Sequence, residues 1–426
     1  MKLAIRGGRI LDPALNLDAA GDLLIEDGKI VSIGKIRGSA DETIDAANLL
    51  VVPGLVDMHV HLREPGDDEE ETIASGAAAA AAGGFTSVAC MPNTDPPIDS
   101  RSAAEFVYQQ AARAGAANVF PIGAITKGRR GEELSEMGSL VAGGAVAFSD
   151  DGDSVADSGL MRRGLEYAKM FGRPIISHCE DKSLSGDGNV NESEVSAILG
   201  FDGMPAAAEE IMIWRDIRIA ELTGGRLHVA HVSTAGAVEL IRVAKAKGLS
   251  VSAEATPHHL LLTDELVKTF DSNYKMNPPL RTARDAAALR EGLRDGTIDA
   301  IASDHAPHTP EEKEVEFTYA PYGVIGLEST LAMVLSELVG EGEGKLDLGT
   351  AIRAMTQAPA RILGLGRKGT LAVGSDADVT IIDLAARWEI DPAAFKSKAR
   401  NCPFAGRRVK GKAAATIVGG RVVRRP

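Results

Sequence analysis

Two histidines separated by a single residue, His59 and His61, follow a short apolar stretch of the chain. That stretch, VPGLV at 52–56, carries its Pro-Gly pair where a strand would begin. Because residues i and i+2 of a strand share a face, both imidazoles can reach one divalent ion such as zinc. Arg63, two residues further on, offers a planar fork that suits a carboxylate. The alternative is a chance pair of packed or solvated histidines, so the interpretation depends on ligands elsewhere.

Further polar residues lie at or after the ends of other short apolar runs. They are Asn93 and Thr94 after 85–90, Asp150, Asp151 and Asp153 after 145–149, His178 at the end of 174–178, His231 near the end of 227–232, His258, His259 and Asn277 after 250–255, and Asp304, His305 and His308 after 298–303. One buried histidine is usually a satisfied core residue, but four of them with aspartates on two other strands are not explained in that way. Four imidazoles and two carboxylates exceed one tetrahedral ion and suit two ions that share a bridging carboxylate.

The elements that would position these residues alternate between strands and helices. Strands are predicted at 52–60, 85–90, 119–124, 145–149, 174–178, 227–232, 250–255 and 298–303. Helices are predicted at 68–82, 101–114, 158–171, 205–224, 234–247 and 284–295, the first with its acidic residues in the first turn. This alternation predicts an α/β fold, a (β/α)8 TIM-like barrel, whose active site lies at the C-terminal strand ends. A doubly wound sheet is the alternative.

Both ends of the chain are rich in short β-like runs. At the N-terminus, Asp27-Gly28 stands between two apolar runs and is a strong hairpin signal. Similar runs with glycine turns occupy 369–384 and 414–423. Because both ends show the same short β-like runs, we predict one small β-sandwich domain formed by the N- and C-terminal segments. The predicted division is 1–52 and 366–426 for the β-domain, and 53–365 for the metal-dependent barrel.

Composition places the chain among acidic globular proteins. It has 426 residues, of which 44% are apolar and 25% charged, with a net charge of −14. This charge argues against a nucleic-acid partner. Three widely spaced cysteines make neither a disulfide framework nor a C-x-x-C metal site, which fits a reducing cytoplasm. We find no secretory leader and no apolar run of about 18 residues, so we expect a cytoplasmic protein without a membrane span.

Seven short motifs, spread over nearly the whole chain, resemble those of the amidohydrolase superfamily and more closely those of the dihydroorotases. They are PGLVDMHVHLREPG (53–66), MPNT (91–94), FSDDG (148–152), SHCED (177–181), AHVST (230–234), MNPPLR (276–281) and SDHAPH (303–308). The resemblance implies a barrel with a small β-domain and one or two zinc ions per subunit. It also implies the reversible cyclisation of N-carbamoyl-L-aspartate to L-dihydroorotate in de novo pyrimidine (UMP) biosynthesis.

The bridge between the two ions separates subtypes of this superfamily. Many members use a carboxylated lysine after the fourth strand, but here no lysine lies between Lys127 and Lys169. The dihydroorotases that carry FSDDG use an aspartate instead, and the matching residue is Asp151. Asp153 or Asp150 is the alternative, because the sequence leaves open by one residue which side chains of this segment point towards the site.

The resemblance assigns the other site residues position by position. The ligands that it implies are His59, His61 and Asp304 for the first ion, and His178 and His231 for the second, with Asp151 between them. The substrate contacts that it implies are His61, Arg63, Asn93, Asn277 and His308, with a weaker match at Tyr322 and Gly323. For Asn277, a plain Asn-Pro turn is the alternative interpretation.

The resemblance also implies how the reaction would proceed. Zinc lowers the pKa of bound water to about 7, so a metal-bound hydroxide would attack the ring amide carbonyl. Asp304 would act as general acid and base and pass the proton to the leaving ring nitrogen. Arg63, Asn93 and His308 would hold the substrate carboxylate. The polar segment 309–323 is predicted to be a mobile lid, and 183–194 to be a second mobile loop.

Two other functions stay open at this point. One is another cyclic-amide hydrolase, such as a hydantoinase or allantoinase, although these mostly use the bridging lysine and lack the carboxylate-binding set. The other is a non-catalytic scaffold for an aspartate transcarbamoylase, although such scaffolds have lost metal ligands. Some family members associate with that enzyme, and a homodimer is the expectation from the family alone.

Overall fold

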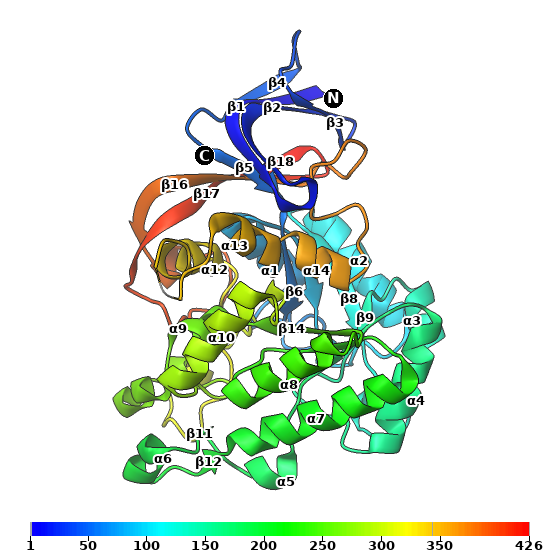
Figure 1. The fold of residues 1–426 in the computed structure, drawn as a ribbon, viewed down its shortest axis with the longest axis vertical. Coiled ribbons are helices and arrows are strands. Elements are labelled where there is room, and N and C mark those ends of the chain that lie inside the picture. Colours follow the sequence, from blue (N-terminus) through cyan, green and yellow to red (C-terminus); the bar gives the residue numbers. More distant parts are fainter. Residues whose placement is uncertain (1, 343, 426) are drawn as a thin grey trace.

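Eight parallel strands form the barrel at the centre of the molecule, in a computed structural model that describes residues 2–342 and 344–425 (Figure 1). Neighbouring strands pair in the order β15-β14-β13-β10-β9-β8-β7-β6. A parallel bridge between Val60 and His305 brings the end of the last strand beside the first. The predicted barrel is confirmed, and the doubly wound alternative is wrong. The strands are β6 (Leu55–Val60), β7 (Phe85–Cys90), β8 (Asn118–Gly123), β9 (Ala147–Phe148), β10 (Ile175–Ser177), β13 (Leu227–Val229), β14 (Val251–Ala255) and β15 (Ala300–Ile301).

Helices connect the strands and cover the outside of the barrel (Figure 1). In α2, Ala104, Val107 and Ala111 are buried at helical spacing, Ser100 caps the first turn, and Gly115 ends the helix in the left-handed region. Among the residues that the structure describes, no helix is long and apolar enough to cross a membrane. The helices are α1 (Ile73–Gly83), α2 (Arg101–Ala114), α3 (Met137–Ala142), α4 (Ser158–Met170), α7 (Ala206–Thr223), α8 (Ala235–Ala246), α9 (Pro257–Leu261), α10 (Ala283–Asp295), α12 (Thr330–Met333), α13 (Leu348–Ala354) and α14 (Gln357–Ile362).

The first helix begins later than its acidic residues predict. We expected a helix over 68–82, but α1 starts after Thr72. Thr72 and Ser75 form a capping box, so hydroxyl groups rather than the acidic run set the start of the helix. Glu70 and Glu71 are buried instead of solvated. The Glu70 carboxylate contacts His308 and the Glu71 carboxylate contacts His305, both of which follow β15.

Both ends of the chain join one mixed sheet, which lies beyond one end of the barrel (Figure 1). Its order is β18-β17-β16-β5-β1-β2-β3, with β4 paired to β1. Strand β5 is parallel to β1 and antiparallel to β16, so it joins the N- and C-terminal segments. The strands are β1 (Lys2–Asp12), β2 (Leu17–Glu26), β3 (Lys29–Gly34), β4 (Glu42–Asp45), β5 (Leu50–Pro53), β16 (Val379–Glu389), β17 (Arg408–Val418) and β18 (Arg421–Arg424).

Side chains from the two ends share one apolar core in this sheet, in which Ile5, Val51 and Ile381 pack together. Asp27 and Gly28 both have positive φ between β2 and β3, as the hairpin signal predicts. A small β-domain built from both ends of the chain is therefore confirmed. The boundaries at 52 and 365 stay predictions.

The two segments that we predicted to be mobile contain short elements of their own. The first includes most of α5 (Lys182–Ser185), and β11 (Val190–Asn191) pairs with β12 (Gly203–Met204) on either side of α6 (Glu194–Leu199). The second begins with α11 (Pro310–Lys313). Their mobility stays a prediction.

Candidate metal centre and active site

Six predicted ligands meet at the C-terminal end of the barrel. His59 lies within β6, and the others follow the ends of β6, β9, β10, β13 and β15: His61, Asp151, His178, His231 and Asp304. Because parallel strands end at the same rim, residues far apart in the sequence converge there. All six side chains are buried, and none exposes more than 7% of its surface.

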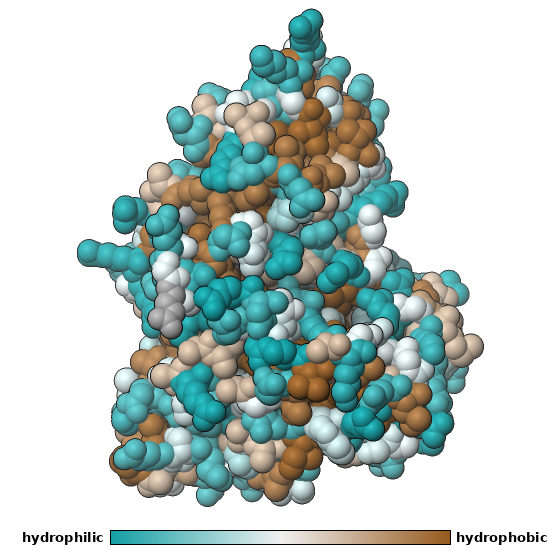
Figure 2. All heavy atoms as spheres, viewed as in Figure 1, coloured by the Kyte–Doolittle hydropathy of each residue, from teal (hydrophilic) through white to brown (hydrophobic). Residues whose placement is uncertain are grey.

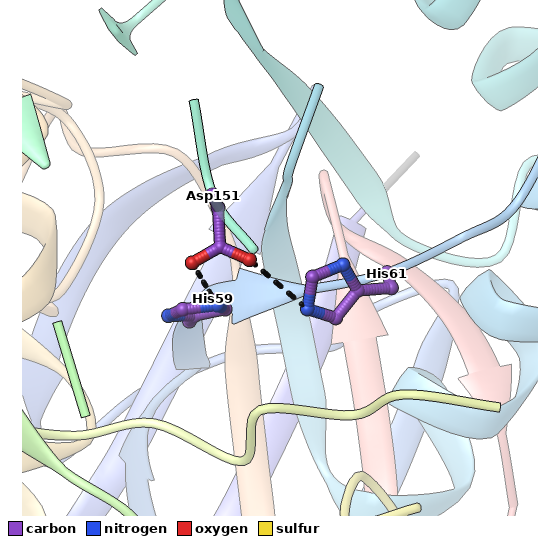
Figure 3. A group of neighbouring side chains, drawn as sticks. All are labelled: His59, His61 and Asp151. Carbon is purple, nitrogen blue, oxygen red and sulfur yellow. Dashed lines mark ion pairs between the residues drawn. The ribbon is translucent and has the colours of Figure 1, made fainter. Parts of the chain in front are cut away.

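Asp151 is shared by two groups of potential ligand atoms. In the first group, Nε2 of His59 lies 3.4 Å from Oδ1 of Asp151, and Nε2 of His61 lies 3.6 Å from Oδ2 (Figure 3). In the second group, Nδ1 of His178 and Nε2 of His231 lie 4.0 and 3.6 Å from Oδ1. In each group the atoms lie within 4.8 Å of one another. A single carboxylate between two imidazole pairs suits two neighbouring cations.

The two neighbouring aspartates face elsewhere. Asp150 accepts hydrogen bonds from the backbone N–H groups of Ile125 and Thr126 and from the Thr126 hydroxyl. Asp153 pairs with Arg129, and its side chain is 55% exposed. Of the three aspartates considered for the bridge, only Asp151 lies between the histidines.

The residues present fit a divalent metal. Within the part of the chain that the structure describes, Nε2 of His59 and Oδ1 of Asp151 are buried without a hydrogen-bond partner. Such atoms are costly, and a cation would satisfy both. Burial would raise the pKa of the Asp151 carboxyl, but the charge of His59 and the nearby imidazole of His231 hold it well below its usual range. Asp151 is therefore ionised, as a metal ligand must be.

Asp304 lies beside the first group. Its Oδ1 is 3.1 Å from Nε2 of His61 and 3.5 Å from Nε2 of His59. Burial would raise the pKa of the Asp304 carboxyl, but the charge of His59 and the hydrogen bond with His61 lower it below its ordinary value. The carboxylate is thus ionised and able to accept a proton.

Glu254, on β14, is a residue that our sequence analysis missed. Its Oε1 lies 2.6 Å from Nδ1 of His59, and its Oε2 lies 3.2 Å from Nε2 of His228. Burial raises the pKa of Glu254, but the charge of His59 and the hydrogen bond from His228 lower it to about 2. Because a carboxylate only accepts, Nδ1 of His59 keeps its proton, and an ion would take the place of the proton on Nε2. The only signal in the sequence was a carboxylate inside the apolar run 250–255.

A cavity of about 630 Å³ opens beside the ligand groups and contains every predicted substrate contact. These contacts are His61, Arg63, Asn93, Asn277, His308, Tyr322 and Gly323. Gly323 has a φ of 128°, and a Cβ there would lie 2.8 Å from Cβ of Ala306. Glycine is therefore required where the segment 309–323 passes the pocket.

Glu70 holds two of these contacts, although the sequence predicted it in the first turn of a helix. Its Oε2 lies 2.6 Å from Nε of Arg63, and its Oε1 lies 3.0 Å from Nδ1 of His308. Nε and Nη2 of Arg63 also donate to the carbonyl oxygen of Pro307. The guanidinium and the imidazole are thus fixed side by side at the pocket wall.

Asn93 has a defined orientation as well. Nδ1 of His61 lies 2.8 Å from Oδ1 of Asn93. When Nε2 of His61 holds an ion, the ring carries its proton on Nδ1 and donates it to Oδ1 of Asn93. The amide of Asn93 therefore keeps its N–H groups for other acceptors, and a substrate carboxylate is such an acceptor.

Comparisons with known sequences agree with this site. The family described as Dihydro-orotase-like matches residues 48–237, and the amidohydrolase family matches residues 201–424. A dihydroorotase from Pelotomaculum thermopropionicum is 56% identical, over 99% of this chain and 98% of its own. One from Citrifermentans bemidjiense is 52% identical over 99% of both chains. The chain belongs to the dihydroorotase family. The resemblance seen in the seven motifs is thereby confirmed.

Solved structures share the whole fold of this dihydroorotase family member. An L-hydantoinase (dihydropyrimidinase) from Arthrobacter aurescens superposes with a TM-score of 0.88 at 29% identity, covering 99% of this chain and 96% of its own. A dihydropyrimidinase from Brevibacillus agri superposes with a TM-score of 0.85 at 26% identity, covering 100% and 95%. The barrel and its terminal sheet therefore occur together in cyclic-amide hydrolases.

Proposed function

We propose that this protein is a zinc-dependent dihydroorotase, which interconverts N-carbamoyl-L-aspartate and L-dihydroorotate in the cytoplasm. One observation carries the proposal: the carboxylate-binding set Arg63, Asn93 and His308 lines the same cavity as the two ligand groups. Full-length relatives named dihydroorotase support it. In pyrimidine biosynthesis the reaction runs towards ring closure.

Two zinc ions fit the ligand groups. His59, His61 and Asp304 would hold one ion, His178 and His231 the other, and Asp151 would contact both. When bound, the ions supply hydroxide near neutral pH and polarise the amide carbonyl of the substrate. Buried imidazole and carboxylate donors are those that zinc accepts.

The substrate carboxylate is placed by the chain itself. Arg63 offers a guanidinium held by Glu70 and by the carbonyl of Pro307. Asn93 turns its N–H groups away from His61 and towards the cavity. Charge-assisted hydrogen bonds to a carboxylate are the strong class, so this end of the site orients the substrate.

Asp304 moves the proton. In ring opening its carboxylate accepts a proton from the attacking water and delivers it to the ring nitrogen as the amide C–N bond breaks. In ring closure the carboxylate accepts the proton of the carbamoyl nitrogen while that nitrogen attacks the carboxyl carbon. It then delivers the proton to the departing carboxyl oxygen, which leaves as water as the C–O bond breaks. The low pKa of this buried group keeps it in the accepting form.

A hydantoinase is the second candidate, because the solved structures named above are of that kind. Their identity to this chain is 26–29%, whereas the dihydroorotases reach 52–56%. Hydantoin also lacks the carboxylate for which Arg63, Asn93 and His308 are arranged.

The deciding experiment follows the absorbance change when zinc-loaded protein is incubated with L-dihydroorotate, hydantoin or allantoin. We expect turnover of L-dihydroorotate alone, its loss after chelation, and its return with zinc. Turnover of hydantoin or allantoin instead would contradict the assignment of L-dihydroorotate as the substrate. Bound metal without turnover of any of the three would favour a scaffold.

Assembly is a separate part of the proposal. We propose a homodimer, and an aspartate transcarbamoylase as a protein partner. Size-exclusion chromatography with light scattering tests the first statement. A pull-down with the tagged transcarbamoylase of the same organism tests the second, with the chelated protein as control.

A further inference from the structure

Glu180, two residues after the ligand His178, collects hydrogen-bond donors at the edge of the cavity. Its side chain is buried and lines the pocket. Oε2 lies 3.1 Å from Nε2 of His178 and 2.9 Å from Nδ2 of Asn277. The Lys182 ammonium lies 2.8 Å from the same oxygen, and the Ser185 hydroxyl donates to Oε1 at 2.5 Å. An ionised carboxylate only accepts, so each neighbour must turn a hydrogen towards it.

The first consequence concerns His178. A neutral imidazole carries one proton, and Glu180 requires it on Nε2. Nδ1 is then left with a free lone pair, and Nδ1 is the nitrogen that lies 3.0 Å from Nε2 of His231 and faces Asp151. The tautomer that Glu180 selects is therefore the one that can bind a metal at the second ligand group.

The second consequence concerns Asn277. Its Nδ2 donates to Glu180, so its carbonyl Oδ1 is the amide atom left for the cavity. The amide of Asn93 is held the other way round, because its Oδ1 faces Nδ1 of His61. One asparagine thus presents N–H groups and the other presents an acceptor.

We propose that Glu180 is a positioning residue that fixes two neighbouring groups at once, the tautomer of the His178 imidazole and the orientation of the Asn277 amide. It holds His178 as the Nε2–H tautomer, with Nδ1 free for the second ion, and it holds Asn277 with its carbonyl oxygen towards a substrate N–H. The substrate half rests on the proposed function: dihydroorotate has a carboxylate for the Asn93 end and ring N–H groups for Asn277. The His178 half does not need it.

The tautomer is tested directly on the wild-type protein. Histidine is labelled with ¹⁵N, the metal is removed, and His178 is assigned by the signal that disappears in His178→Gln. We expect His178 to be protonated on Nε2 alone. Protonation on Nδ1 alone overturns the proposal, and this measurement needs neither turnover nor a variant of Glu180.

Glu180→Gln removes the charge at constant shape. We expect a mixture of His178 tautomers. We also expect one of the two zinc ions to bind about 10–100-fold more weakly than in the wild type. Glu328→Gln is the matched control, since Glu328 is a half-buried carboxylate that accepts two backbone N–H groups away from the site. Wild-type zinc retention and an unchanged tautomer in Glu180→Gln would overturn the proposal.

Asn277 is tested by exchanging the two side-chain types. In Glu180→Gln the new amide can donate to Asn277 and turn its N–H groups towards the substrate, so we expect KM to rise about 10-fold, the worth of one hydrogen bond. In the double variant Glu180→Gln/Asn277→Asp, the introduced amide donates and the introduced carboxylate again offers the substrate an acceptor. KM should then fall back while the zinc defect stays, and a KM that does not recover overturns this half. If the wild type does not turn over L-dihydroorotate, the proposed function fails, and the tautomer and zinc results still stand.

Discussion

Three of the residues that we place at the site hold a backbone conformation that side chains rarely adopt. Arg63, His231 and Asp304 have φ values of 60°, 29° and 47°. Such residues cost about 1–3 kcal/mol each and persist only where the surrounding structure enforces them. Here the barrel rim enforces them, and the strain lies where side chains are aimed at the ligand groups and the cavity.

Asp304 is the residue on which the proposed chemistry depends most. In Asp304→Asn the amide oxygen can still face a metal, but the side chain cannot accept a proton. We expect kcat to fall by roughly 10²–10⁴-fold while L-dihydroorotate still binds. Steady-state kinetics and a binding titration check this, with zinc content measured in parallel. Near-full kcat at full zinc content would remove the general-base role.

Glu70 acts through the residues that it holds. In Glu70→Gln the charge beside Arg63 and His308 is lost, so the guanidinium and imidazole are less fixed. We expect KM for L-dihydroorotate to rise about 10-fold, with kcat changed less, because the loss is in carboxylate binding. Zinc content should not change. An effect on kcat alone would contradict this role.

The candidate metal ligands could be predicted from the sequence because histidines are rare and stand at alternate or strand-end positions. The carboxylates that orient these ligands and the substrate contacts could not. The chain has 60 acidic residues, and Glu70, Glu180 and Glu254 look like any others until the fold turns them inward. Glu70 in particular lies in an acidic run that resembles a solvated helix start.

At the scale of elements, the segment 309–323 is held by two buried lysines. Nζ of Lys275 donates to the carbonyl oxygens of Phe317 and Thr318, and Nζ of Lys313 donates to those of Pro321 and Gly323. Burial lowers the pKa of Lys275 to about 8. The two amino groups anchor the backbone of a segment that lines the cavity.

Lys275→Met should loosen this segment. Hydrogen bonds to charged groups contribute roughly 1.5–3 kcal/mol each, so losing two should expose 309–323 to protease about 10-fold faster or more. Limited proteolysis with mass spectrometry measures the cleavage. A substrate analogue should slow cleavage in the wild type. Equal cleavage with and without the analogue would count against a lid.

At the scale of the molecule, Glu328 connects the barrel to the C-terminal segment. Its Oε1 accepts the backbone N–H groups of Lys396 and Ser397. Burial raises the pKa of Glu328 to about 7, against 4.5 for an ordinary glutamate. The folded protein therefore holds this proton between about pH 4.5 and pH 7, where the unfolded chain has lost it. This group's contribution to stability is complete below pH 4.5 and is lost as pH rises through 7.

Glu328→Gln removes that loss and keeps an oxygen for both N–H groups. We expect the variant to gain stability over the wild type as pH rises from 5 to 8, by about 1–2 kcal/mol. Thermal unfolding at a series of pH values measures the difference. A pH-independent difference would show that the carboxyl of Glu328 ionises normally.

The order of strands and helices was predictable because each barrel strand is a short apolar run between helical stretches. The pairing of the two chain ends was predictable only from the short β-like runs that both ends contain. The strand β5 that joins β1 to β16 carries no signal for its partners, since a buried strand such as Leu50–Pro53 is apolar throughout.

The hydropathy view shows polar side chains over most of one face, with apolar patches between them (Figure 2).

The bridge between Val60 and His305 also has a consequence for the synthesis of the protein on the ribosome. His61 and Asp304 are 243 residues apart, and they meet only when the last barrel strand has been made. At 5–20 residues per second, a ribosome needs on the order of 10–50 s for that interval. During this time the chain contains His59 and His61 but not yet Asp304. The complete set of candidate ligands therefore exists only after the last barrel strand has been made.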